Sequence, residues 1–312
     1  QTSFENAIPG SGHLYAARAG AAHLSPAARL REQWTGISLL HLLRKLTRLD
    51  DASLLAETEK FAEISRRLVN RGKITCACVG EKSTFARIEN HLEPFLDRLP
   101  EKGGHVLDKT MAPASGPGTF GWATSVPVSY VTRTYRTVPY THPDTARLLV
   151  LAKLLRAGYL HREIREKGGA YGGLASCNPE GGLFSLLSYR DPHLTRTLRV
   201  YDDAAAWAAT GAFSDESIKE AQLSVFGDLD RPLSPGSRGA HEFANQRQNL
   251  TLEIRQAMRE RILATTRADL CRVAKKYLVD NQDKIDSIVS NDDTLNKANS
   301  ELAGGQIKIT RI

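Results

Sequence analysis

The sequence predicts an α+β fold in which an antiparallel or mixed sheet carries helices packed on one face. Two observations lead to this fold class. Segments with the two-residue period of strands are concentrated between residues 121 and 190, and segments with helical periodicity follow them as far as residue 279. Strands that come first and helices that come after favour an α+β layer over an alternating, doubly wound one.

The composition is that of a folded globular protein. The chain has 312 residues, of which 41% are hydrophobic and 25% charged, and this balance excludes intrinsic disorder and a collagen-like fold. The length suggests two domains. No stretch has the roughly 20 apolar residues that a membrane helix needs, so we expect no membrane partner.

Residues 23–70 predict two helices. Ser25 followed by Pro26 is a typical N-cap and first-turn signal, and a stripe of leucines comes after it. A second apolar stripe begins after Asp50, and Gly72 is well placed to end it. The N-terminal region is therefore expected to be helical.

The next elements are a strand over residues 73–79 and an amphipathic helix over 84–99. Cys76 and Cys78 lie two apart in the strand and would point to one face of it. We favour two small buried side chains there, with a metal or redox role as the alternative.

Because the four cysteines of the chain are too few for a disulfide framework, we expect a reducing compartment.

Periodicity disappears between residues 100 and 121, which are rich in glycine and proline. We place the domain boundary there. The predicted division is a first part over residues 1–105, a linker over 106–120 and a second, complete domain over 121–312.

The second domain begins with strands around residues 121–138 and a helix over 143–167. Two further strands, over 170–177 and 182–190, are joined by a turn of the type that connects a hairpin. The remaining elements are predicted as helices over 192–209, 215–228, 237–262 and 267–279, a strand over 284–290, a short helix, and a strand over 306–312.

An internal similarity suggests a duplication. Residues 68–79 resemble residues 278–289: each copy has Leu-Val followed by Asn or Asp, then Lys-Ile, then Val, and a polar turn with a helix comes next. The offset is 210 to 211 residues. If the repeat is real, the chain holds the end of one module followed by a complete second one.

The strongest candidate for chemistry is the segment 160–173, in which a charged helix end meets a strand between pairs of glycines. Arg165 and Tyr171 lie six residues apart across that turn, so a guanidinium and a phenol could face the same space. A phenol can donate to a developing oxyanion, and a guanidinium can hold a carbonyl or carboxylate. The alternative is a glycine-rich helix end in which Glu163 and Lys167 pair on a solvated face.

The sequence lacks the motifs that would indicate a zinc site, a catalytic nucleophile or a nucleic-acid-binding surface. His161 and Glu163 are two apart on a helix and point to different sides, and no His-x-x-x-His or His-x-x-Glu-His occurs in the sequence. A Gly-x-Ser-x-Gly elbow and a P-loop are also absent from it. The pI of about 9.2 reflects a net charge of +6 between residues 101 and 200. Because that segment lacks a stacking platform, we expect no nucleic-acid partner.

Three motifs together resemble one family. Residues 159–173 read YLHREIREKGGAYGG, residues 180–182 read EGG, and residues 188–192 read SYRDP. These motifs are similar to the C-terminal half of the pitrilysin-type metallopeptidases, which have an inverted zinc motif. The resemblance implies four related α+β domains in the whole enzyme, with this chain holding the end of the third (residues 1–105) and all of the fourth (121–312).

The family resemblance also implies a division of labour. The zinc ligands and the general base would lie in an N-terminal half that this sequence does not contain, so no metal ligand is expected here and the chain alone is expected to be inactive. Arg165 and Tyr171 match the family residues that reach the substrate. Gly168, Gly169, Gly172 and Gly173 would let a peptide approach closely.

The implied activity is degradation of targeting peptides and other short unstructured peptides, in the mitochondrial matrix or the plastid stroma. The alternative is a non-catalytic peptide-binding or assembly module of the same fold. Because the chain opens on Gln1 and not on a methionine, we expect a processed protein or a piece of a longer one.

Overall fold

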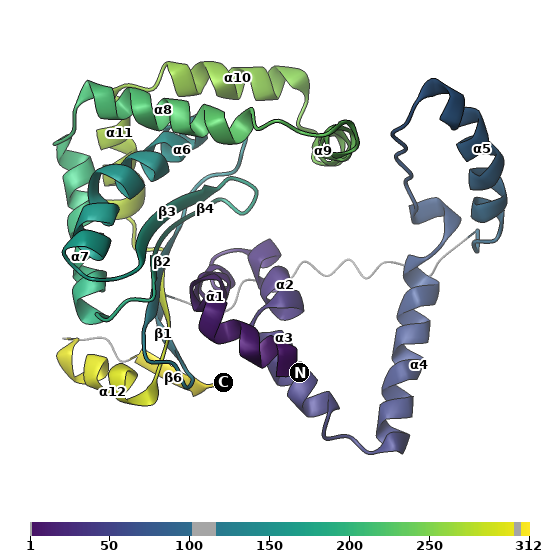
Figure 1. The fold of residues 1–312 in the computed structure, drawn as a ribbon, viewed down its shortest axis with the longest axis horizontal. Coiled ribbons are helices and arrows are strands. Elements are labelled where there is room, and N and C mark those ends of the chain that lie inside the picture. Colours follow the sequence, from purple (N-terminus) through teal and green to yellow (C-terminus); the bar gives the residue numbers. More distant parts are fainter. Residues whose placement is uncertain (1, 102–116, 303–306) are drawn as a thin grey trace. The chain divides into compact units, whose positions relative to one another are not determined.

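The computed structural model describes residues 2–101, 117–302 and 307–312 (Figure 1). The chain divides into two compact units. The larger is made of Gln1–Arg44, Thr110–Asp230 and Gln256–Ile312, and the smaller of Lys45–Lys109 and Arg231–Arg255. The larger unit combines residues from both predicted domains. The assignment to a third and a fourth domain of a longer enzyme stays a prediction.

A mixed six-stranded sheet forms the centre of the larger unit, which confirms the predicted fold class. The strand order is β3-β4-β2-β5-β1-β6. β1 is parallel to β5 and β6, whereas the other neighbouring pairs are antiparallel. The strands are β1 (Gly118–Ala123), β2 (Tyr130–Arg136), β3 (Gly172–Asn178), β4 (Leu183–Tyr189), β5 (Lys284–Ser290) and β6 (Ile307–Arg311).

The start of β1 bears on the predicted linker, and the position of β3 defines one edge of the sheet. β1 begins at Gly118, so the end of the predicted linker is strand, while residues 106–116 lie outside the described residues. At the opposite side of the sheet, β3 has a neighbour on one side only among the residues that the structure describes. Its sequence, GLASCN after the first glycine, contains no charged residue and no proline.

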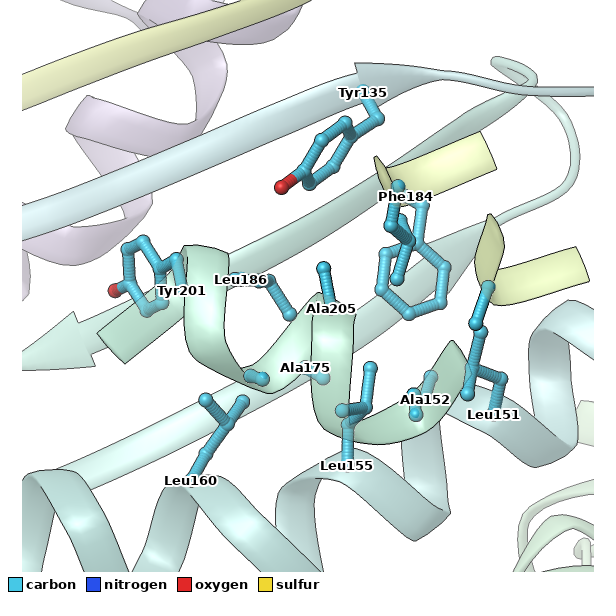
Figure 2. Packing of buried hydrophobic residues seen from close by; sticks show 14 of the residues in the cluster. Tyr135, Leu151, Ala152, Leu155, Leu160, Ala175, Phe184, Leu186, Tyr201 and Ala205 are labelled. Carbon is cyan, nitrogen blue, oxygen red and sulfur yellow. The ribbon is translucent and has the colours of Figure 1, made fainter. Parts of the chain in front are cut away.

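One face of the sheet is covered by helices of the C-terminal region. Figure 2 shows this core, in which Phe184 and Leu186 of β4 pack against Leu155 and Tyr201 of the covering helices. All four side chains are fully buried. Phe184 and Leu186 share one face of the sheet because alternate residues of a strand point to the same side. The covering elements are α6 (Asp144–Leu155), the π-helix η2 (Arg156–Glu166), α7 (Thr195–Thr210), α8 (Asp215–Leu229), α10 (Leu252–Leu263), α11 (Arg267–Ala274) and the π-helix η3 (Lys275–Val279).

The opposite face is also covered, contrary to the expectation of helices on one face. α1 (Thr2–Ala21) lies across β2, β5 and β4 (Figure 1). Small residues allow the close contact, since a methyl group added at Gly12 would overlap the ring of Tyr130. Because both faces of β2 are covered, its residues from Tyr130 to Tyr135 are all buried, and the polar alternation of a one-sided strand is missing.

α1 was not predicted at all. Pro9, Gly10 and Gly12 interrupt the segment, and its apolar residues are mostly alanine and glycine, which give little helical periodicity. The interruption is visible in the structure as a kink with non-helical angles at Ser11.

The helices that follow agree better with the prediction. α2 (Pro26–Thr35) begins at the predicted cap, where the Ser25 hydroxyl accepts a hydrogen bond from the backbone of Ala28. α3 (Ile37–Leu46) continues the leucine stripe as a separate helix. At the other end of the chain, α12 is the predicted short helix (Asp292–Glu301).

The smaller unit contains α4 (Asp51–Leu68), the 3-10 turn η1 (Arg71–Lys73), α5 (Lys82–Asp97) and α9 (Pro235–Arg247). The predicted strand over 73–79 is wrong: residues 74–80 form no strand, because a strand needs a neighbour to pair with. Cys76 and Cys78 are exposed, so their predicted burial is also wrong. The predicted helix over 237–262 is interrupted between α9 and α10, where Asn249 has a positive φ of 55°.

Candidate functional site

The candidate site lies where η2 ends and the edge strand β3 begins. The last turns of η2 are wide, since Lys167 N–H donates to the carbonyl of Arg162. The helix then closes on glycine: Gly169 N–H donates to the carbonyl of Arg165 at 3.0 Å, and Gly169 has a φ of +74°. This turn sends the chain back along the sheet and brings Tyr171 next to the helix end that carries Arg165.

The four glycines of the predicted site are in different situations. A side chain at Gly168 or Gly173 would collide with backbone carbonyls of η2, and Gly169 needs the left-handed conformation. Packing within the chain therefore accounts for Gly168 and Gly173, and backbone conformation accounts for Gly169. A methyl group at Gly172 would meet nothing within 4 Å. Gly172 is the one whose lack of a side chain leaves open space at the surface.

The Arg165 and Tyr171 side chains are neighbours. The guanidinium carbon of Arg165 lies 5.7 Å from the centre of the Tyr171 ring, within the range of a cation–π contact. The Tyr171 residue is 65% exposed, and its hydroxyl has no hydrogen-bond partner within the described part of the chain. The predicted proximity of the guanidinium and the phenol is therefore present in the structure.

The ion pair of Glu163 and Lys167, which the alternative interpretation of the helix end predicts, is also present. Lys167 donates to Glu163 at 2.8 Å and Arg162 donates to the same carboxylate at 2.9 Å. The bond from Lys167, aided by that from Arg162, holds the pKa of Glu163 below its usual value. This exposed network leaves out Arg165, whose guanidinium contacts the tyrosine instead.

Tyr171 is held by the end of β4. Its backbone N–H donates to the carbonyl of Tyr189 at 3.0 Å, and the two rings meet edge to face with centroids 5.4 Å apart. The ring of Tyr189 also contacts His13 and Tyr130 at centroid distances of 4.7 and 5.8 Å. An aromatic cluster thus connects the candidate site with α1.

The kink in α1 supplies acceptors to this cluster. The hydroxyl of Tyr130 donates to the carbonyl of Pro9, and that of Tyr189 donates to the carbonyl of Gly10 at 3.4 Å. Both carbonyls precede the break at Ser11, where helical hydrogen bonding is interrupted. Burial in this cluster lowers the pKa of His13, which favours the neutral imidazole.

A buried carboxylate stabilises the loop after β4. Asp191 accepts hydrogen bonds from the backbone of His193 at 2.9 Å and from the hydroxyl of Thr197 at 2.7 Å. Its backbone pairs with that of Ser129 in both directions. Burial raises the pKa of Asp191. The sequence motif SYRDP therefore has a structural role next to Tyr171 that the sequence alone does not reveal.

Metal binding and membrane insertion can be assessed for the described residues. Among residues 2–101, 117–302 and 307–312, no group of three or more His, Cys, Asp or Glu side chains could hold a metal ion. His161 contacts Glu166 at 3.1 Å as an isolated pair. The donor set of this part of the chain therefore does not fit a zinc site. None of the helices in the same ranges is long and apolar enough to cross a membrane.

The fold has counterparts among solved structures, which include peptidases. A conserved protein from Enterococcus faecalis matches 93% of this chain and 66% of its own at a TM-score of 0.60, with 14% identity. A protease from Helicobacter pylori matches 68% of this chain and 53% of its own at 0.52, with 16% identity. Pitrilysin matches 73% of this chain and 24% of its own at 0.50, with 12% identity. The fold is that of the pitrilysin-type peptidases.

Sequence similarity identifies which family of pitrilysin-type peptidases the chain belongs to. Residues 124–291, more than half of the chain, match the family model described as the PreP C-terminal domain. Residues 1–46 match a model for a segment associated with the peptidases of family M16, subfamily C. The chain belongs to the presequence protease family, as its C-terminal part. This confirms the family resemblance of the three sequence motifs.

Individual relatives agree with this assignment. The mitochondrial presequence protease of Xenopus tropicalis is 32% identical over 305 residues, which cover 89% of this chain and 29% of the relative. That of Danio rerio is 35% identical over 297 residues, covering 88% and 28%. The chain thus spans less than a third of the length of these relatives. Their names confirm the expected mitochondrial location.

Proposed function

We propose that the chain is the C-terminal part of a zinc metalloendopeptidase that degrades targeting presequences and other short unstructured peptides in the mitochondrial matrix. The observation that carries this proposal is the contact of an exposed phenol, Tyr171, with a guanidinium, Arg165, at the edge of the sheet. Both groups are free to meet a ligand, and both belong to the motif that is shared with the pitrilysin-type family.

Each group has a chemical role in this proposal. The Tyr171 hydroxyl donates a hydrogen bond to the oxyanion that develops on the scissile carbonyl, and the Arg165 guanidinium holds the peptide backbone. Gly172, where no side chain occupies the surface, lets the peptide backbone come close. Gly168, Gly169 and Gly173 shape the turn that places both side chains.

The zinc ion, its ligands and the general base belong to the N-terminal half in this proposal, since the described residues of this chain do not fit a zinc site. The C-terminal half closes over the peptide and completes the chamber. We therefore expect residues 1–312 alone to cleave no peptide, and cleavage to return when the N-terminal half is added.

The test compares Tyr171→Phe with the unchanged enzyme, with both halves present. Removal of one oxyanion donor typically costs about 2.7–4 kcal/mol of transition-state stabilisation, or a loss of roughly 100- to 1,000-fold in kcat. We expect a loss of this size with little change in KM. An unchanged kcat would exclude Tyr171 from the mechanism. If no pairing of the two halves cleaves peptides, the non-catalytic peptide-binding or assembly module becomes the better explanation.

A further inference from the structure

A second arginine lies beside the candidate site, and the proposed function gives it no role. Arg190 follows β4 and stands opposite the start of β3, where its carbonyl accepts a hydrogen bond from the backbone of Tyr171 at 3.4 Å. It is one of two non-glycine residues in the described part of the chain with a positive φ, at 50°. Such backbone strain persists only where the surroundings enforce it, and it is common at functional sites.

The side chain of Arg190 is exposed, and its orientation is fixed by aromatic groups. The guanidinium carbon lies 5.5 Å from the centre of the Tyr189 ring. Burial raises the pKa of the Tyr130 phenol, and the nearby positive charge of Arg190 opposes that rise. The contact with the Tyr189 ring restricts the Arg190 side chain at the surface, so less conformational entropy is lost when it binds a ligand.

Arg165 and Arg190 bracket the edge-to-face pair of Tyr171 and Tyr189, one guanidinium over each ring. Within the described ranges, neither arginine forms an ion pair with a carboxylate.

The carboxylates nearby in the sequence are already engaged. Glu163 is bound by Lys167 and Arg162, and Glu166 contacts His161. Asp191 is buried and accepts hydrogen bonds from its own loop and helix. Two cations without a counter-charge near one surface are favourable for an anionic ligand.

We propose that Arg190 binds a carboxylate of the peptide substrate and so acts as a specificity-determining residue of the same site. The planar guanidinium matches a carboxylate with two parallel hydrogen bonds, whereas a backbone carbonyl offers one oxygen. This inference rests on the proposed function, because the peptide is the substrate that the function supplies. The carboxylate is either the C-terminus of the peptide or an acidic side chain.

The experiment uses the complete enzyme and three peptides of ten residues with one common core sequence. The first has a free C-terminal carboxylate and no acidic side chain, the second is its C-terminal amide, and the third is the amide with one glutamate. We expect the enzyme to have a KM about tenfold lower for a peptide with the recognised carboxylate than for the plain amide, and Arg190→Gln to abolish that difference in KM.

Two further variants show whether the change in KM depends on the charge of Arg190, on its planar shape or on the loss of any exposed arginine. Arg190→Lys keeps the charge and loses the planar fork, so we expect an intermediate KM. Arg199→Gln removes an exposed arginine on α7 and should leave all three KM values unchanged. Thermal melting of each variant checks the fold.

Each outcome decides a separate point. An effect confined to the free-acid peptide assigns the C-terminal carboxylate, and one confined to the glutamate peptide assigns a side chain. Equal changes for all three peptides, or none, overturn the proposal for Arg190. Tyr171→Phe is measured in parallel: if it keeps full kcat, the proposed function fails, whereas if it loses kcat while Arg190→Gln has no effect, only this inference fails.

Discussion

The rings of Tyr171 and Tyr189 meet edge to face at 82°, with their centroids 5.4 Å apart. Tyr189 is half-buried and Tyr171 is exposed, so the inner ring limits the positions that the outer ring can take. A catalytic phenol that can move by an ångström loses much of its effect. The contact therefore connects the packing of the sheet with the proposed chemistry.

Replacing the inner ring should lower catalysis without removing a catalytic group. For Tyr189→Leu in the complete enzyme we expect kcat to fall about tenfold, because an aromatic pair contributes about 0.5–1.5 kcal/mol to ordering. Tyr189→Phe is the matched control, since it keeps the ring and loses only the 3.4 Å hydrogen bond to Gly10. A tenfold loss in both variants would mean that the hydroxyl, and not the ring, is what matters.

Substitutions at two glycines distinguish a role in the stability of the fold from a role in substrate binding. Gly169→Ala places a side chain at a φ of +74° and should destabilise the fold by about 1–2 kcal/mol. Gly172→Ala meets open space and should leave the melting temperature unchanged, while KM for peptides rises. If Gly172→Ala leaves KM unchanged too, close approach of the substrate at this position is ruled out.

The ion pair of Arg133 and Asp286 should dominate the stability of the sheet. Arg133 is 5% exposed, and its Nε and Nη2 donate to the two oxygens of Asp286 at 2.7 and 3.0 Å across β2 and β5. Asp286→Ala leaves a buried guanidinium with one exposed partner, Asp202, and should cost about 3–5 kcal/mol in chemical denaturation. Asp202→Ala is the control, with an expected loss below about 1 kcal/mol.

The pH dependence of stability should contain a contribution from Asp144. Burial alone would raise its pKa, but hydrogen bonds from Arg272 and Tyr277 outweigh burial and lower the pKa below its usual value. A carboxyl group with a lowered pKa in the folded state stabilises the fold fully above its unfolded pKa of about 3.9. That contribution is lost as the pH falls through the folded value.

Asp144→Asn should therefore be less stable at pH 7 by about 1–3 kcal/mol, and the difference from the unchanged protein should shrink below pH 4. Urea unfolding at pH 7, 4 and 3 measures this. Asp228→Asn removes an exposed partner of Lys153 and serves as the control, with a small effect at every pH. A difference that grows as the pH falls would contradict the assignment.

The sequence was most informative where elements carry strong local signals. The cap at Ser25, the hairpin strands β3 and β4 and the helix that leads to Arg165 were predicted close to their observed ranges. Local signals fail where distant residues decide the structure. Residues 74–80 have a strand-like pattern but no partner strand, and α1 depends on close packing of small residues that carries no periodicity.

The candidate site was predicted in part. Arg165 and Tyr171 were identified from the chemistry of one short segment, but Tyr189 and Arg190 were not given a role. The available signal was off by two residues: counting outward from the predicted turn at 178–181 pairs Gly172 with Leu187, whereas the observed register pairs it with Tyr189. The contact with α1 could not have been found in this way, because the carbonyls of Pro9 and Gly10 reach the site only through the tertiary fold.

The edge strand β3 has a consequence for the behaviour of the isolated chain in solution. Natural sheets protect their edges with lysine, proline or a bulge, and β3 carries no charged residue and no proline over Gly172–Asn178. Two copies of the chain could join by antiparallel pairing of this strand. We expect the isolated chain to self-associate in a concentration-dependent way, and Ser176→Lys, at an exposed position of β3, to keep it monomeric in sedimentation measurements.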